Sequence, residues 1–74
     1  MKFRIKLVKN IIPEPNDILK EYGTFENESE AIKIAEKEYR KKVILYRKTI
    51  LSDKSYTIDY GSHCKFILVE EISE

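Results

Sequence analysis

The sequence predicts a single α+β domain over residues 1–74, built as two layers, with one long helix packed on a mainly antiparallel sheet of three to five strands. Two patterns support this prediction. Residues 27–46 repeat apolar side chains at steps of three and four residues, which is the spacing of one helix face. Residues 2–8 and 56–60 alternate apolar with polar side chains, which is the spacing of half-buried strands. The patterns leave the order of the strands open.

The first predicted strand, residues 2–8, has one apolar and one basic face. The apolar side chains are Phe3, Ile5 and Leu7, and the basic ones are Lys2, Arg4 and Lys6. Pro13 and Pro15 follow, and because proline has no N–H to donate, we expect the strand to end before them. Residues 17–25 fit either a helical turn begun by Asn16 or a short strand paired with the first, and both alternatives stay open.

The predicted helix begins at Asn27, a favourable N-cap, and Glu30 follows at the spacing of a capping box. Its apolar stripe consists of Ala31, Ile32, Ala35, Tyr39, Val43 and Tyr46. Two pairs of opposite charge at four-residue spacing support it, Glu36 with Arg40 and Glu38 with Lys42. No Gly or Pro marks the helix end, which we expect between Lys42 and Tyr46. A short strand at residues 48–51 should follow.

The last two predicted strands, residues 56–60 and 64–72, admit two registers. A two-residue turn at Gly61 and Ser62 places Tyr60 opposite His63, and both faces then mix apolar with charged side chains. One more loop residue makes one face apolar, with the pairs Tyr60–Cys64, Ile58–Phe66 and Tyr56–Leu68. Because the buried face usually sets the register, we favour this second pairing. It buries Cys64 and places Asp59 opposite Lys65 as an ion pair.

Composition excludes several classes of protein. Charged residues make up 36% of the chain but the net charge is only +1, which argues against a DNA mimic and a general polyanion binder. The single cysteine excludes an internal disulfide and fits a reducing, cytoplasmic location. No stretch approaches the roughly 18 apolar residues of a membrane span, and residues 1–10 lack the apolar run of a signal peptide. Because phosphate-binding loops and dinucleotide fingerprints are missing too, we expect no cofactor and no enzymatic activity.

His63 and Cys64 suggest nucleophilic or metal chemistry. Neighbouring side chains of a strand point to opposite faces, so this thiol and imidazole would not meet. Asp59, His63 and Cys64 could supply three metal ligands, but a fourth ligand and a recognised spacing are missing. We therefore expect neither a catalytic thiol nor a metal site, and a cysteine-dependent enzyme is the least favoured alternative.

The favoured register leaves one sheet face open, and this face is the candidate interaction surface. It carries Lys2, Arg4, Lys6, Lys65, Ile67 and Val69. The alternatives are a solvated face, a protein-binding surface and an RNA-binding surface. The two β-branched residues favour association with another protein, or with a second copy in an edge-paired dimer. The core-facing positions of most tyrosines disfavour stacking on nucleotide bases.

Residues 56–66, with the sequence YTIDYGSHCKF, resemble a signature near the C-terminus of short uncharacterised proteins from phages and mobile elements of low-GC Gram-positive bacteria. That signature reads aromatic, any residue, Ile, Asp, aromatic, Gly, Ser, His or Trp, two residues of any kind, and Phe. Residues 22–25, followed by Glu30, Ala31 and Ala35, are similar to the helix entry of many such proteins. The resemblance covers about a third of the chain. It implies a small accessory protein that blocks a host defence system.

These observations predict a non-enzymatic protein-binding module, with a phage or mobile-element inhibitor of host defence as its most specific form. Its expected partner is a host or phage protein, or a second copy in a homodimer. The alternative is a small RNA- or DNA-binding domain that uses the basic sheet face. No feature of the sequence predicts contact with a membrane.

Overall fold

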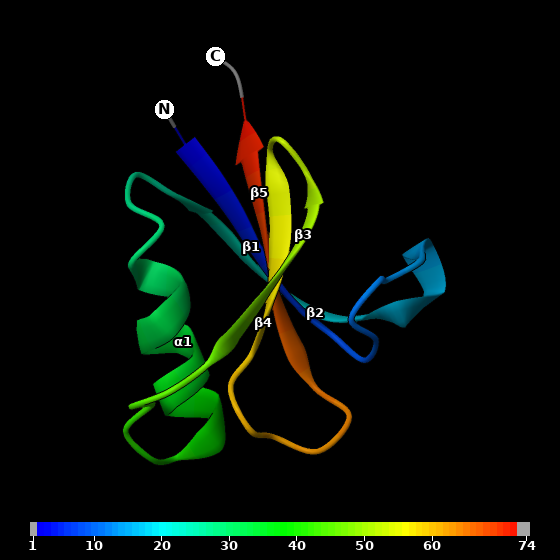
Figure 1. The fold of residues 1–74 in the computed structure, drawn as a ribbon. Coiled ribbons are helices and arrows are strands. Elements are labelled where there is room, and N and C mark those ends of the chain that lie inside the picture. Colours follow the sequence, from blue (N-terminus) through cyan, green and yellow to red (C-terminus); the bar gives the residue numbers. More distant parts are fainter. Residues whose placement is uncertain (1, 73–74) are drawn as a thin grey trace.

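The computed structural model describes residues 2–72 and contains a five-stranded antiparallel sheet with one α-helix (Figure 1). In chain order the elements are β1 (Lys2–Val8), the 3-10 turn η1 (Pro15–Asp17), β2 (Ile18–Phe25), α1 (Glu30–Tyr39), β3 (Arg47–Ser52), β4 (Ser55–Asp59) and β5 (Phe66–Ile72). The predicted α+β class and antiparallel sheet are confirmed. Residues 18–25 form a strand paired with β1, which decides between the two alternatives for this segment.

The strand order is β2-β1-β5-β4-β3, so β2 and β3 are the two edge strands. The strand at each end of the described chain, β1 and β5, lies in the middle of the sheet, and the two pair with each other (Figure 1). Strands β3, β4 and β5 follow one another as a meander. Among residues 2–72, each edge strand therefore has one hydrogen-bonded neighbour and one side without a partner strand.

The hydrophobic core joins the helix to one face of the sheet. Ala31 and Ala35 of α1 are fully buried, and their short side chains allow the helix to lie close to the strands. The buried strand residues of this cluster are Ile5, Leu7, Ile58, Ile67 and Val69, and Tyr60, which directly follows β4, is buried with them. The alternation predicted for the first strand is confirmed, because Ile5 and Leu7 are buried and Phe3 packs against them.

The register of the last hairpin differs from both predicted registers. Ile58 pairs with Ile67 and Tyr56 with Val69, so residues 60–65 form a longer connection between β4 and β5. Pairing with β1 decides this register, since Ile5 lies opposite Val69 and Leu7 opposite Ile67. Both faces of β5 are apolar, so its own sequence does not say which face packs against the helix.

The connection between β4 and β5 also changes two predicted contacts. Asp59 lies opposite Arg47 rather than Lys65, and its carboxylate accepts the Gly61 N–H at 3.1 Å. Gly61 and Cys64 both have positive φ angles, of 94° and 57°, which the turn requires. Cys64 is therefore an exposed loop residue, and the prediction that it is buried is wrong.

The helix is shorter than predicted, with ten residues. Its N-cap position is Ser29, and Asn27 contributes only its backbone carbonyl, which accepts the Glu30 N–H at 3.3 Å. At the other end Arg40 adopts a left-handed conformation with φ of 60°, so the helix stops before Lys42. The predicted Asn27 cap and the predicted helix end are both wrong.

Glutamate side chains in the second half of the helix accept hydrogen bonds from groups outside it. The Glu36 carboxylate accepts the Val43 N–H at 3.0 Å and so holds the segment that leaves the helix. The Glu38 carboxylate accepts the Tyr22 hydroxyl at 2.6 Å. Glu36 and Glu38 therefore do not bond their predicted partners, Arg40 and Lys42. The partner of Glu38, Tyr22, belongs to β2, which is distant in the sequence.

The second face of the sheet is partly covered by the segment between β1 and β2. The Thr57 hydroxyl donates to the Ile11 carbonyl at 2.8 Å, and both Thr57 and Val8 are buried. Proline side chains of this segment border a hollow of about 250 Å³ over Leu68. This face is therefore not the open surface that the sequence predicts.

Candidate functional site

The predicted interaction surface does not form. Ile67 and Val69 have no exposed area, because the observed register turns them toward α1 and the core. Their predicted exposure is wrong, and the physical reason is the pairing of β5 with β1 described above. A partner could reach these two side chains only if the helix moved away.

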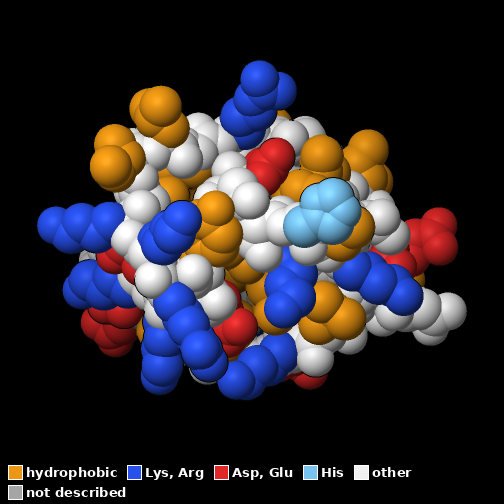
Figure 2. Space-filling view, turned by 90° about the horizontal axis from the view of Figure 1, so that it is seen from below, with side chains coloured by type: hydrophobic (Ala, Val, Ile, Leu, Met, Phe, Trp, Pro, Cys, Tyr) orange, Lys and Arg blue, Asp and Glu red, His pale blue; other side chains and the backbone are white. Residues whose placement is uncertain are grey.

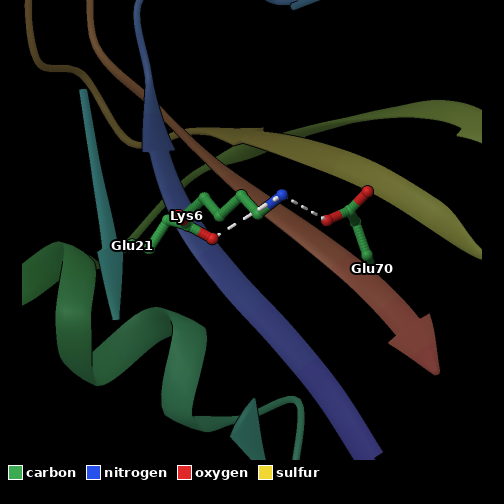
Figure 3. A network of polar contacts seen from close by, with 3 residues as sticks. All are labelled: Lys6, Glu21 and Glu70. Carbon is green, nitrogen blue, oxygen red and sulfur yellow. Dashed lines mark ion pairs between the residues drawn. The ribbon is translucent and has the colours of Figure 1, made fainter. Parts of the chain in front are cut away.

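The basic residues of that surface are dispersed. Lys6 has a side chain only 13% exposed, and its ammonium lies 3.2 Å from Glu70 and 4.0 Å from Glu21 (Figure 3). Arg4 and Lys65 are exposed, but Lys65 belongs to the loop between β4 and β5. Lys2 is half-buried at the start of β1. The six predicted residues therefore do not make one surface, and Lys6 serves as an ion-pair partner that links the strands.

Two of the three residues considered for nucleophilic or metal chemistry lie in one loop of the structure. His63 and Cys64 are both exposed in the loop between β4 and β5. Across residues 2–72, no three His, Cys, Asp or Glu side chains come together in a way that could hold a metal ion. Within the same residues, no helix has the length and apolar character needed to cross a membrane.

A different surface stands out, at the segment that connects α1 to β3 and continues into that strand. Ile44 and Leu45 are 85% and 87% exposed, and Ile50 on β3 is 65% exposed. Tyr46, between them, is about half exposed. Large aliphatic side chains exposed in a row are uncommon on a protein that has no partner.

The charge of this segment is one-sided. Between Tyr39 and Ser52 the chain has five basic residues and no acidic residue: Arg40, Lys41, Lys42, Arg47 and Lys48. Viewed from the end where α1 stops, Lys and Arg side chains project around exposed apolar side chains (Figure 2). We call residues 40–50 the basic edge, because they combine these bases with the free side of β3.

The strand part of the basic edge is regular and open. Arg47 to Ile50 pair in continuous register with residues 56–59 of β4, and the irregularity comes only after Ile50. No other strand pairs with β3 in the sheet that residues 2–72 form. Where β3 begins, a hollow of about 260 Å³ is lined by Leu45, Tyr46, Arg47, Asp59 and Gly61. An incoming chain would thus meet unpaired backbone groups along β3 and a shallow hollow where the strand begins.

Contacts with the core hold the basic edge in place. Val43 packs against the core, and its N–H is bonded to Glu36, so the chain turns outward at Ile44. The Lys48 ammonium lies 4.1 Å from the centre of the Tyr56 ring, a cation–π contact. The exposure of Ile44 and Leu45 therefore follows from fixed contacts on either side of them.

Two tyrosines fasten the helix next to this surface. The Tyr56 hydroxyl donates to Glu28, in the turn that leads into α1, at 3.1 Å, and the Tyr22 hydroxyl donates to Glu38 of α1. Burial, followed by the hydrogen bond to the carboxylate, raises the pKa of each phenol above its ordinary value. Tyr22 therefore keeps donating to α1 over the physiological range, and Tyr56 keeps donating to the turn before α1.

The other edge strand, β2, is less suited to pairing. Its pairing with β1 shifts register twice, at Tyr22 and at Leu19, and Gly23 has a φ of 102°. Bulges of this kind twist an edge strand away from a partner. Of the two sheet edges, β3 is therefore the one that another chain could extend.

Sequence reasoning missed the basic edge because it assigned Val43 and Tyr46 to the apolar stripe of the helix. The signal that could have found it was the run from Tyr39 to Ser52 without an acid, combined with four consecutive apolar residues at 43–46. An apolar run surrounded only by bases does not match a core helix.

Comparison of the chain with protein-family models, with curated proteins and with solved structures found no significant match.

Proposed function

We propose that this chain is a non-enzymatic protein-binding module whose contact surface is the basic edge. The observation that carries the proposal is the nearly complete exposure of Ile44 and Leu45 among five bases and no acids. Fully burying one such aliphatic side chain is worth about 1.5–3 kcal/mol, so the pair can supply a substantial part of a binding energy. The surrounding bases select a partner of acidic character.

The runner-up is a small RNA- or DNA-binding domain, which the exposed bases support. Stacking of nucleotide bases needs accessible aromatic rings. Tyr22 donates to Glu38 of α1, Tyr56 donates to Glu28 in the turn before α1, and Tyr39 packs edge-on against the buried Tyr60 at 5.8 Å. Tyr46 of the basic edge is 47% exposed, but the aliphatic side chains of Ile44, Leu45 and Ile50 are more exposed, which favours a protein partner.

A symmetric homodimer through β3 is disfavoured by charge. Pairing two copies of this strand would bring the five bases of each basic edge close to those of the other. Like charges directly opposite in a sheet destabilise the pairing. An acidic partner protein is therefore proposed in place of the edge-paired dimer that the sequence suggested.

The biological setting is proposed from the resemblance of residues 56–66 to phage and mobile-element proteins. In that setting the partner is a host or phage protein in the cytoplasm, and blocking a host defence protein is the most specific form of the proposal. In this chain the same segment forms β4 and the turn with positive φ at Gly61 and Cys64. The role of this segment would then be structural, because β4 pairs with β3 and so positions the basic edge.

Affinity capture from host lysate tests the proposal, with wild type, Leu45→Asp and a matched control, Leu19→Asp. Leu19 is another exposed leucine, at 49% against 87% for Leu45, but it lies on the opposite edge strand. We expect wild type and the control to retain the same acidic protein after nuclease treatment, and Leu45→Asp to lose it. Loss of all retained material after nuclease treatment, with steep weakening as salt rises, would favour the nucleic-acid alternative.

A further inference from the structure

We propose that the partner binds as an extended acidic segment that adds to the free edge of β3 as a sixth strand. This inference rests on the proposed function and specifies the form of its partner. It starts from a sheet in which β3 is a regular edge strand and β2 a bulged one. Main-chain hydrogen bonds to such an edge supply affinity, and side chains at alternate positions supply selectivity.

The two edges avoid unwanted pairing by different means. Bulges at Leu19 and Tyr22 disturb the backbone of β2 and hinder any incoming strand. Basic side chains protect β3, at Arg47 and Lys48 within the strand and at three bases before it. Charge protection is selective, because it repels another basic strand but attracts an acidic one.

The side chains of β3 specify the pattern of the added strand. Successive residues point to opposite faces, so Lys48 and Ile50 share the face that also carries Tyr56, while Arg47 and Thr49 share the other. A complementary strand would place acidic residues opposite Arg47 and Lys48 and an apolar residue opposite Ile50. Two neighbouring acids with apolar residues on both sides satisfy this pattern in either strand direction.

The segment before β3 adds an anchor for the same strand. Ile44 and Leu45 lie immediately before the strand, and the hollow of about 260 Å³ at Leu45, Tyr46 and Asp59 lies at its start. An apolar side chain at one end of the added strand can enter this hollow while the strand pairs with Arg47 to Ile50. The apolar anchor and the charged pairs therefore act on one continuous peptide.

The test uses a blocked synthetic peptide of two Val-Val-Glu-Glu repeats and the full chain. Amide signals and hydrogen exchange are followed by NMR. We expect saturating peptide to shift the signals of residues 47–50 and to slow exchange at the outward N–H groups of β3. The same peptide with alternate backbone nitrogens methylated should bind about tenfold more weakly or worse, since it keeps the charges but loses the strand hydrogen bonds. A peptide with Lys in place of Glu should not bind.

Protein variants check the location. Arg47→Glu combined with Lys48→Glu should weaken peptide binding by about tenfold or more. Lys20→Glu combined with Lys37→Glu changes the net charge equally at exposed positions outside the basic edge, and it should have a small effect. The amide spectrum of each variant reports whether it is folded.

Several results would overturn the inference. They are the absence of shifts at β3 with millimolar acidic peptide, equal binding of the methylated peptide, and equal weakening by the two double variants. If these occur while capture of a protein still depends on Leu45, the added strand is refuted and the protein-binding function stands. If sedimentation shows concentration-dependent self-association that Arg47→Glu with Lys48→Glu abolishes, the occupant is a second copy and the inference is wrong.

Discussion

The substitution Val69→Thr tests the register on which the whole fold depends. Thr keeps the size and β-branching of Val, so the strand geometry is preserved while one methyl group becomes a hydroxyl. Val69 has no exposed area and packs among core residues, so the hydroxyl would lose its hydration. Burying an unpaired hydroxyl costs about 1–3 kcal/mol in protein mutants.

That cost is large relative to the stability of the chain. At about 0.05–0.15 kcal/mol per residue, 74 residues have a free energy of unfolding of about 4–11 kcal/mol. Urea unfolding followed by circular dichroism should therefore show a clear fall in the midpoint, with little change in the slope.

Ile50→Thr is the matched control, because Ile50 is 65% exposed on the edge strand and the same chemical change there should cost little. Equal stability of the two variants would refute the register. In the register favoured from the sequence Val69 lies on an open face, and Val69→Thr would then be nearly neutral. A cost confined to Val69→Thr therefore separates the observed pairing of β5 from the predicted one.

Three further predictions follow from the contacts around the helix and the last loop. Tyr22→Phe removes the bond to Glu38 and should lower the free energy of unfolding at neutral pH by about 1 kcal/mol. Because the pKa of Tyr22 is raised in the folded state, the unfolded chain loses this proton first, so wild-type stability should fall as the pH rises above about 10. Tyr22→Phe should lessen that fall. If thermal unfolding shows the same pH profile for both proteins, the assigned hydrogen bond is contradicted. The exposed Cys64 should react with a thiol reagent in the folded protein about as fast as in urea at the same pH, and strong protection in the folded protein would contradict its place in the loop. Asn27→Ala should lower the free energy of unfolding by well under the roughly 1 kcal/mol of a lost side-chain cap, since Asn27 bonds Glu30 through its backbone. A full loss of about 1 kcal/mol on thermal unfolding would show that the Asn27 side chain caps the helix after all.

The sequence alone determined those features that depend on local pattern. Alternation in residues 2–8 predicted β1 and its buried face, because only one of its two faces is apolar. The spacing of Ala31 and Ala35 predicted the middle of the helix and its buried side. The antiparallel α+β class followed from these patterns and the turn signals between them.

The tertiary structure decided whatever depended on a partner distant in the sequence. Both faces of β5 are apolar, so only its pairing with β1 shows that Ile67 and Val69 are buried. The helix ends at Tyr39, and Glu36 bonds the Val43 N–H beyond that end; nothing in the local spacing distinguishes this bond from an ion pair with Arg40. The candidate surface depends on the same contact, since the turn after Val43 leaves Ile44 and Leu45 exposed next to an edge strand. Local periodicity reports which side chains share a face, whereas the contacts between elements decide which face is buried and which edge stays open.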